Sequence, residues 1–130
     1  MEVMPAQCAK YRHPAHIQFQ FLFDVVTGAW AALTPMNEDR RDHAMVSTHG
    51  KLYVAGGIGN AGYLKSVECF DPTTRVWTTI APMNEARTNL GLAVLGDKLY
   101  AIGGQNLSSV ECRDLCTPGG GALNGLRWRR

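Results

Sequence analysis

Apolar and polar residues alternate along this chain in short runs, and none of the runs continues with a helical period. Phe19, Phe21 and Phe23 share one side of the first run, which is typical of a half-buried strand. The same reasoning predicts strands over residues 30–33, 44–48, 51–56, 66–71, 76–80, 90–95, 98–103 and 109–112. Short strands at such regular spacing predict an all-β chain of successive antiparallel sheets.

Turn-forming residues separate these runs. His49-Gly50 and Gly96-Asp97 predict tight hairpin connections. Asp71-Pro72 predicts a type I turn, because Asp accepts backbone hydrogen bonds and Pro presets φ. Residues 58–64, which include Gly59, Asn60 and Gly62, are predicted to form a longer flexible loop.

A long repeat organises the strands. Pro82 follows Pro35 by 47 residues, and the stretches 35–57 and 82–104 share Pro-Met-Asn-Glu, Arg, Lys-Leu-Tyr and Gly-Gly at that offset. Such a period indicates stacked repeat units. Bulky rings and paired glycines recur in the same register and are interpreted as structural, since rings fill the space between sheets and glycine permits positive φ. These residues are Trp30, Tyr53, Gly56, Gly57, Trp77, Tyr100, Gly103 and Gly104.

The order Pro-Met, Arg, Leu-Tyr-Val, Gly-Gly, Val-Glu, Phe-Asp-Pro and Trp resembles the kelch repeat over roughly residues 19–112. The resemblance is to kelch-like (BTB-kelch) adaptor proteins, as a fragment of about two repeats. It implies a partial kelch β-propeller, with one complete four-stranded blade between two incomplete ones. The expected division is an irregular leader at 1–17, the partial propeller at 18–112 and a Gly-rich, Arg-ended irregular tail at 113–130.

The pattern departs from the family at both ends. The first unit has only its last two strands, from Phe19 to Leu33. In the third unit, Ser109-Val110-Glu111-Cys112 echoes residues 66–69, but Gly120 stands where a Trp is expected, six residues after Asp114. We therefore interpret the end of the chain as an unrelated tail, from alternative splicing or a truncated gene prediction, and expect an unpaired edge at residues 109–112.

Candidate binding residues lie on the loops, where repeat scaffolds usually carry recognition. In the family, the corresponding loops form the propeller mouth at which peptide ligands dock. Here they carry Arg40, Arg41, Asp42, Asn60, Tyr63, Arg87, Asn89, Gln105 and Asn106. Arg40 and Arg87 have a second interpretation, which we favour: they recur at one repeat position and pair with Glu38, Glu85 or loop carbonyls. Asp42 and Asn89 differ between the repeats, which suits recognition slightly better.

Composition narrows the function classes. The hydrophobic content of 45% and charged content of 18% are ordinary for a globular chain, which argues against disorder throughout. A net charge of +2 argues against recognition of nucleic acid or a membrane surface by global charge. We see no signal peptide and no apolar run long enough for a membrane span, so we expect a cytoplasmic protein with reduced cysteines.

No group of residues has the spacing of a catalytic site, and we expect no enzymatic activity, no cofactor and no metal. Cys8, His13 and His16 match no common zinc pattern. Cys112 and Cys116 could lie near each other, but no second pair of ligands completes a zinc site. Cys69 and Cys112 occupy equivalent positions, so we expect packing residues and no disulfide. The basic end at residues 127–130 could stack on nucleic acid, but a solvated end is the favoured interpretation.

The resemblance implies a protein-interaction module similar to the substrate-binding part of a cullin-dependent ubiquitin-ligase adaptor. That role also needs a BTB domain, and residues 1–18 are too short to supply one. Actin or cytoskeletal binding is the alternative. Because stacked repeats bury their apolar faces only against neighbours, we expect part of the apolar surface around Leu92, Val94, Leu99 and Ile102 to lack a cover. The isolated chain should then aggregate, self-associate through open blade edges, or be completed by another propeller fragment.

Overall fold

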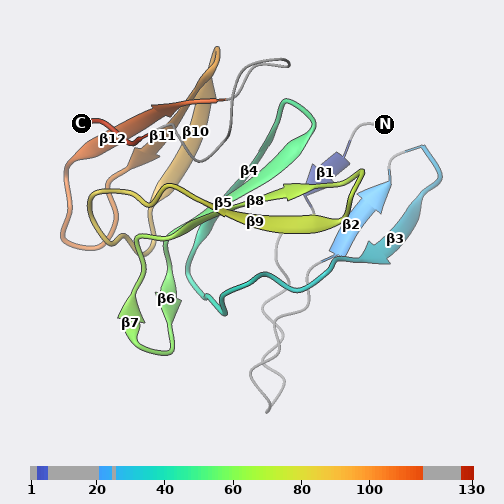
Figure 1. Ribbon diagram of the computed structural model, residues 1–130, viewed down its shortest axis with the longest axis horizontal. Coiled ribbons are helices and arrows are strands. Elements are labelled where there is room, and N and C mark those ends of the chain that lie inside the picture. The colour runs from blue at the N-terminus through green and yellow to red at the C-terminus, as the bar shows by residue number, and fades with distance from the viewer. Residues whose placement is uncertain (1–2, 6–20, 25, 116–126) are drawn as a thin grey trace.

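The computed structural model describes residues 3–5, 21–24, 26–115 and 127–130. These residues form strands, turns and loops, with three successive antiparallel sheets that we call blades 1, 2 and 3 and one small two-stranded sheet (Figure 1). Within them no helix has the length and apolar character needed to cross a membrane. The all-β, antiparallel prediction is confirmed.

Blade 2 is the complete unit. It has four strands in the order β4-β5-β8-β9, and each pair of neighbours is antiparallel. The strands are β4 (Ala44–Thr48), β5 (Lys51–Ala55), β8 (Val67–Asp71) and β9 (Val76–Ile80). Each lies within one residue of its predicted bounds, because hairpin turns fix where the alternating runs begin and end.

Blade 3 repeats the first three of these strands. They are β10 (Gly91–Leu95), β11 (Lys98–Ile102) and β12 (Val110–Asp114). Strand β12 continues through Arg113 and Asp114, two residues past the predicted end of the propeller, because these residues pair with Leu99 and Lys98.

Blade 1 contains the predicted strands β2 (Phe21–Asp24) and β3 (Ala29–Ala32) and one that was not expected. Strand β1 (Val3–Pro5), from the predicted irregular leader, pairs antiparallel with β2. The interpretation of residues 3–5 as irregular is therefore wrong, since β2 offers a free backbone edge that these residues fill. Residues 6–17 of the predicted leader, with Cys8, His13 and His16, lie outside the described residues.

The connections follow the predicted turn chemistry. In the β4–β5 turn His49 has φ 52° and Gly50 has φ 72°, the signs of a type I′ hairpin. Asp71 Oδ1 accepts the Thr73 amide at 2.9 Å at the start of the β8–β9 turn. Residues 58–64 were predicted as a flexible loop, but they contain a small hairpin of β6 (Ile58–Gly59) and β7 (Gly62–Tyr63). Arg41 extends this pairing through a bridge to Ile58.

Two apolar clusters lie on opposite faces of blade 2. Toward blade 1 the cluster contains Leu33, Leu52, Val54, Phe70 and Trp77. Toward blade 3 the cluster contains Tyr53, Ala55, Val67, Cys69, Ile80, Met83, Leu90, Leu99, Ala101, Leu115 and Trp128. Alternation along each strand thus sends successive side chains to different neighbours, as in a stack of sheets.

Of the four residues around which uncovered surface was predicted, three lie on the covered side of blade 3. Leu99 is fully buried, and Leu92 and Val94 pack against the cluster between blades 2 and 3. Only Ile102, 44% exposed, belongs to the uncovered side of blade 3. Alternation along a strand separates its side chains into two faces, but it does not say which face packs against the neighbouring blade.

Candidate functional site

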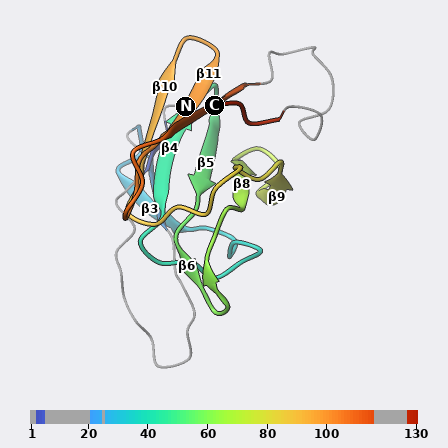
Figure 2. The same ribbon diagram turned by 90° about the vertical axis from the view of Figure 1, so that its left-hand side faces the viewer.

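The loops before and within each unit meet at one end of the blades. Figure 2 shows the β6–β7 hairpin at the opposite end of the molecule from the β10–β11 turn. The loop ends are fixed from within by two buried arginines, Arg40 in blade 2 and Arg87 in blade 3, which are 1% and 0% exposed.

Arg40 closes the base of the loop between β5 and β8. Its Nη1 donates to the carbonyl oxygens of Gly56 at 2.9 Å and Ser66 at 3.0 Å, the residues on either side of the excursion. Its Nη2 donates to Glu68 Oε2 at 2.8 Å, and Glu68 is also fully buried. A buried arginine needs a partner for its charge and acceptors for its donors. Glu68 pairs with the charge, and both terminal nitrogens of Arg40 donate hydrogen bonds.

The carboxylate of Glu68 also fixes the preceding loop. Its Oε1 accepts the Asn37 amide at 2.7 Å and its Oε2 accepts the Glu38 amide at 3.3 Å. Glu68 therefore links a strand of blade 2 to the linker that enters the blade. Glu38 lies at the edge of the network, 3.6 Å from Arg40 Nη2, and accepts a hydrogen bond from the Ser66 hydroxyl.

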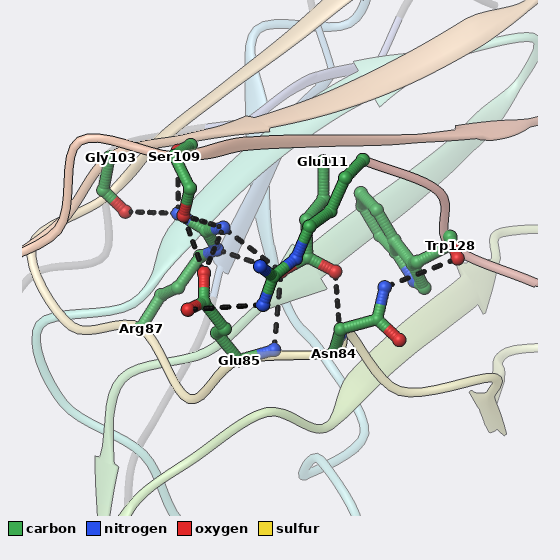
Figure 3. A network of polar contacts seen from close by, with 8 residues as sticks. Asn84, Glu85, Arg87, Gly103, Ser109, Glu111 and Trp128 are labelled. Atoms are coloured by element: carbon green, nitrogen blue, oxygen red, sulfur yellow. Dashed lines mark hydrogen bonds and ion pairs between the residues drawn. The ribbon is translucent and has the colours of Figure 1, made fainter.

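Blade 3 repeats this network (Figure 3). Arg87 Nη1 donates to the carbonyl oxygens of Gly103 at 2.8 Å and Ser109 at 2.9 Å, and Arg87 Nη2 lies 2.9 Å from Glu111 Oε2. Glu111 accepts the amides of Asn84 and Glu85, as Glu68 does from the matching residues. The Ser109 hydroxyl donates to Glu85, and this bond is the main reason that the pKa of Glu85 is lowered.

Arg40 and Arg87 therefore cannot belong to the partner-contacting set, and the structural interpretation of both is correct. The pairing with Glu38, Glu85 and loop carbonyls is confirmed, but the main partners Glu68 and Glu111 were missed. The sequence did carry a signal for them, because Ser66-Val67-Glu68 recurs as Ser109-Val110-Glu111. A glutamate on the apolar side of a strand needs a buried cation.

The other predicted loop residues include six exposed side chains at this end of the blades, which we call the loop rim: Arg41, Asn60, Tyr63, Asn89, Gln105 and Asn106. The Tyr63 hydroxyl bonds Gln105 Oε1 at 3.3 Å across blades 2 and 3. The Asn89 amide donates to the Asp42 carbonyl at 2.9 Å. These contacts join the predicted positions of two blades into one surface.

Asp42 and Asn89 have a backbone reason for their identity. Both residues have φ 54°, in the left-handed region, and Asn106 has φ 61°. Asp and Asn enter this region more readily than other residues with side chains. The difference between Asp42 and Asn89 therefore needs no recognition role, although Asn89 remains exposed on the rim while Asp42 is half-buried.

Both buried arginines and their glutamate partners lie within segments that match a family of known proteins. The Kelch motif matches residues 39–84 and 86–117, which together form more than half of the chain. The chain belongs to the kelch-motif family. No curated protein matches the chain in sequence.

Solved structures show the same fold. Of 133 matching chains, one is the structure of YjhT, with a TM-score of 0.67 and 19% sequence identity. The match covers 87% of this chain and 42% of the YjhT chain. The protein is thus a partial kelch β-propeller that spans less than half the length of this solved relative.

Residues 128 and 129, near the end of the chain, dock on blade 3. Cys112 and Arg129 form an antiparallel bridge with two backbone hydrogen bonds of 2.7 Å. Trp128 is 5% exposed, and its Nε1 donates to the Ala81 carbonyl at 2.9 Å. In blade 2, Trp77 Nε1 donates to the Thr34 carbonyl at 2.7 Å, and Ala81 follows Thr34 by 47 residues.

Trp128 therefore takes the place of the missing tryptophan, fourteen residues after Asp114 where the repeat has six. The Asn84 side chain donates to the Trp128 carbonyl, as Asn37 does to Trp77. Exposed ion pairs from Arg130 to Glu85 and from Arg129 to Asp114 accompany this docking. The predictions of an unrelated tail and a fully unpaired edge are wrong at these residues, and burial removes Trp128 as a stacking surface for nucleic acid.

Of the two described cysteines, Cys69 packs in the cluster between blades 2 and 3, and Cys112 is half-buried. Cys69 and Cys112 are both free thiols at equivalent strand positions, as predicted. Burial raises the pKa of the Cys69 thiol, so its reactive thiolate form is suppressed. Cys116 lies outside the described residues. Within the described ranges, no group of three or more His, Cys, Asp or Glu residues could hold a metal ion.

Gly56 and Gly103 give a matched test of how tightly the two kelch units pack. Both have positive φ, 65° and 61°, so alanine strains the backbone at either position. A Cβ on Gly56 would clash with the Arg87 carbonyl oxygen, whereas the nearest atom to a Cβ on Gly103 is 3.4 Å away. We expect Gly103→Ala to cost about 1 kcal/mol of unfolding free energy, and Gly56→Ala at least about 2 kcal/mol more.

Urea unfolding followed by tryptophan fluorescence measures both variants. Equal losses for Gly56→Ala and Gly103→Ala would show that the Arg87 loop does not press on Gly56 in solution.

Proposed function

We propose that the chain is a protein-interaction module that binds an extended segment of a protein partner at the loop rim. The observation that carries this proposal is the contrast between the buried base of the loops and their exposed tips. Arg40 and Arg87 hold the two ends of each excursion in the same way. The excursion beyond the base is longer in blade 2, residues 57–65, than in blade 3, residues 104–108. A rigid loop base that supports exposed loop tips of different length and sequence is suited to recognition.

The chemistry of the rim suits a peptide with a carboxylate. Arg41 is the charged member of the rim, and an exposed guanidinium can bind a carboxylate in bidentate fashion. Tyr63 is 55% exposed and offers an aromatic face beside its hydroxyl. The amides of Asn60, Asn89, Gln105 and Asn106 can donate to and accept from a peptide backbone.

Within this class we propose presentation of a protein substrate to a cullin-dependent ubiquitin ligase, with the ligase-recruiting domain outside these residues. Support comes from the resemblance to kelch-like adaptor proteins, and the six rim side chains offer the polar and aromatic contacts that a short peptide segment needs. Actin binding is the alternative, and cosedimentation with filaments tests it. Pelleting that survives changes in the rim would replace the rim proposal.

The rim is tested by fluorescence binding to arrayed peptides that carry graded numbers of Asp and Glu. We expect affinity to rise with peptide acidity and to fall with added salt. Arg41→Ala should weaken binding about tenfold, since hydrogen bonds to charged groups contribute about 1.5–3 kcal/mol.

Arg75→Gly is the matched control. Arg75 is an exposed arginine at the opposite end of blade 2, with φ 60°. Gly28 precedes it by 47 residues in the repeat, so glycine suits the backbone there. This variant should bind within about twofold of the unmodified chain. Equal weakening by Arg41→Ala and Arg75→Gly, or no weakening by Arg41→Ala, would remove the rim from the binding site.

A further inference from the structure

Blade 3 has an apolar face that no described residue covers, which we call the open face. Its apolar residues are Ala93, Leu95, Tyr100, Ile102, Val110 and Cys112, and the exposed ion pair of Lys98 and Asp114 lies at its edge. The strand register aligns Ile102 with Val110 and aligns Tyr100 with both Ala93 and Cys112. Leu95 is 73% exposed, and Ile102 and Val110 are each 44% exposed.

The same face of blade 2 is buried by the chain itself. Tyr53 and Cys69, which correspond to Tyr100 and Cys112, are 2% and 3% exposed. Ala55 and Val67, which correspond to Ile102 and Val110, are fully buried. Their cover is the near side of blade 3, with Leu99 and Ala101. The open face is therefore the surface against which a further kelch blade packs.

Blade 1 presents the complementary surface. Phe23 and Trp30 form a tilted ring pair with centroids 4.9 Å apart, and Phe70 and Trp77 form the equivalent pair in blade 2 at 5.0 Å. Phe70 and Trp77 are buried in the cluster that faces blade 1. Trp30 is 61% exposed. Among the described residues, the near side of blade 1 and the far side of blade 3 are therefore both left without a neighbouring blade.

We propose that a second copy of this chain supplies the missing neighbour, with the Phe23–Trp30 side of one copy packed on the open face of the other. The two surfaces differ, so the contact is heterologous, and such contacts close into rings when the rotation permits. Two copies provide six blades, within the 4–8 of closed propellers. The YjhT match agrees in size, since twice its 42% coverage is 84% of that chain. This assembly does not depend on peptide binding at the loop rim.

The first experiment measures the mass of the full 130-residue chain in solution by light scattering and native mass spectrometry. A dimer is expected. A monomer at micromolar concentration would overturn the proposal, and a different protein would then have to cover the open face. Open-ended polymers overturn the closed pair as well, because the rotation then fails to close.

Charged substitutions on each surface test which faces meet. Ile102→Lys or Trp30→Glu should each weaken the dimer about tenfold or more, because each places an unpaired charge in an apolar contact. Val76→Lys is the matched control, since Val76 is a strand residue of blade 2 with 53% exposure and lies outside both surfaces. It should leave the dimer unchanged. Circular dichroism confirms that all three variants keep their sheets.

Mixing the two weakened variants identifies the head-to-tail arrangement. In the mixed pair one contact is unmodified, and the other brings the introduced lysine of one chain to the introduced glutamate of its partner. The Ile102→Lys and Trp30→Glu chains should therefore form a heterodimer. If two open faces met each other instead, the Trp30→Glu chain would dimerise alone. Failure of the mixture to restore the dimer would overturn the proposed contact.

Discussion

Replacing Arg87 with methionine is expected to lower the free energy of unfolding by about 3–5 kcal/mol, because it leaves the carboxylate of Glu111 buried without its cation. Glu111 is fully buried, and its remaining donors are the backbone amides of Asn84 and Glu85. The substitution also removes the donors to the Gly103 and Ser109 carbonyls that close the loop. Folded domains of this size are stable by only about 5–15 kcal/mol, so the loss is a large share of the total.

Urea unfolding of Arg87→Met and of Lys98→Met separates a buried ion pair from an exposed one. Lys98 Nζ lies 2.7 Å from Asp114 Oδ1 in the same blade, and both side chains are more than 40% exposed. Exposed pairs contribute little to stability, so Lys98→Met should have a small effect. If Arg87→Met does not fold, Arg87→Lys should give an intermediate loss, because lysine keeps the charge but not the fork of donors. Equal effects of Arg87→Met and Lys98→Met would contradict the proposed network.

The sheets were predictable from the sequence because local signals agree with the repeat. The His49-Gly50 turn ends β4 and begins β5 at the residues where the alternation changes, and Gly96 serves β10 and β11 in the same way with φ 59°. Two independent signals, turn chemistry and the 47-residue offset, therefore fix the strands of these two hairpins.

The buried partners were harder to predict because they are distant in the chain. Arg40 and Glu68 are 28 residues apart in the chain. Glu38 is close to Arg40 in sequence and was therefore predicted as its partner. Arg41, next to Arg40, is exposed. Sequence periodicity does not distinguish these two arginines, and the distinction depends on the carboxylate that blade 2 places beneath the loop.

The same reason explains the misplaced uncovered surface. Leu92 and Ile102 are both apolar residues of blade 3, but strand register places Leu92 opposite Ala101 and Ile102 opposite Gly91. Leu92 and Ala101 point toward blade 2, and Ile102 points away from it. Choosing between the two sides requires the position of the neighbouring blade, which the alternating pattern does not contain.

The role of Trp128 was not predicted, because Trp128 lies fourteen residues after Asp114 whereas Trp77 lies six residues after Asp71. Arg127 is exposed and Trp128 is buried beside it, in the place that Trp77 holds in blade 2. The register was lost over the longer connection between Asp114 and Trp128, although the Trp itself was present. The signal in the sequence is Trp128 itself, which restores the repeat pattern after a longer connection.

Replacing Trp128 with alanine is expected to cost about 3–5 kcal/mol, the usual loss for a large aromatic side chain removed from a core. The ring packs in the cluster between blades 2 and 3 and its Nε1 donates to Ala81. Trp128→Phe keeps an aromatic ring but loses that hydrogen bond, so its cost should be smaller, with about 1 kcal/mol from the bond itself.

Thermal and urea unfolding of Trp128→Ala, Trp77→Ala and Tyr63→Ala decide whether the end of the chain is part of the fold. Tyr63 is 55% exposed, so Tyr63→Ala should change the free energy of unfolding by no more than about 0.5 kcal/mol. Trp77→Ala sets the scale for a tryptophan at this blade position, with 5% exposure like Trp128. A loss for Trp128→Ala near that of Trp77→Ala would show that a distant tryptophan completes the third blade. A loss near that of Tyr63→Ala would show that the blade is stable without it, and β12 would then be the true outer edge of the sheet.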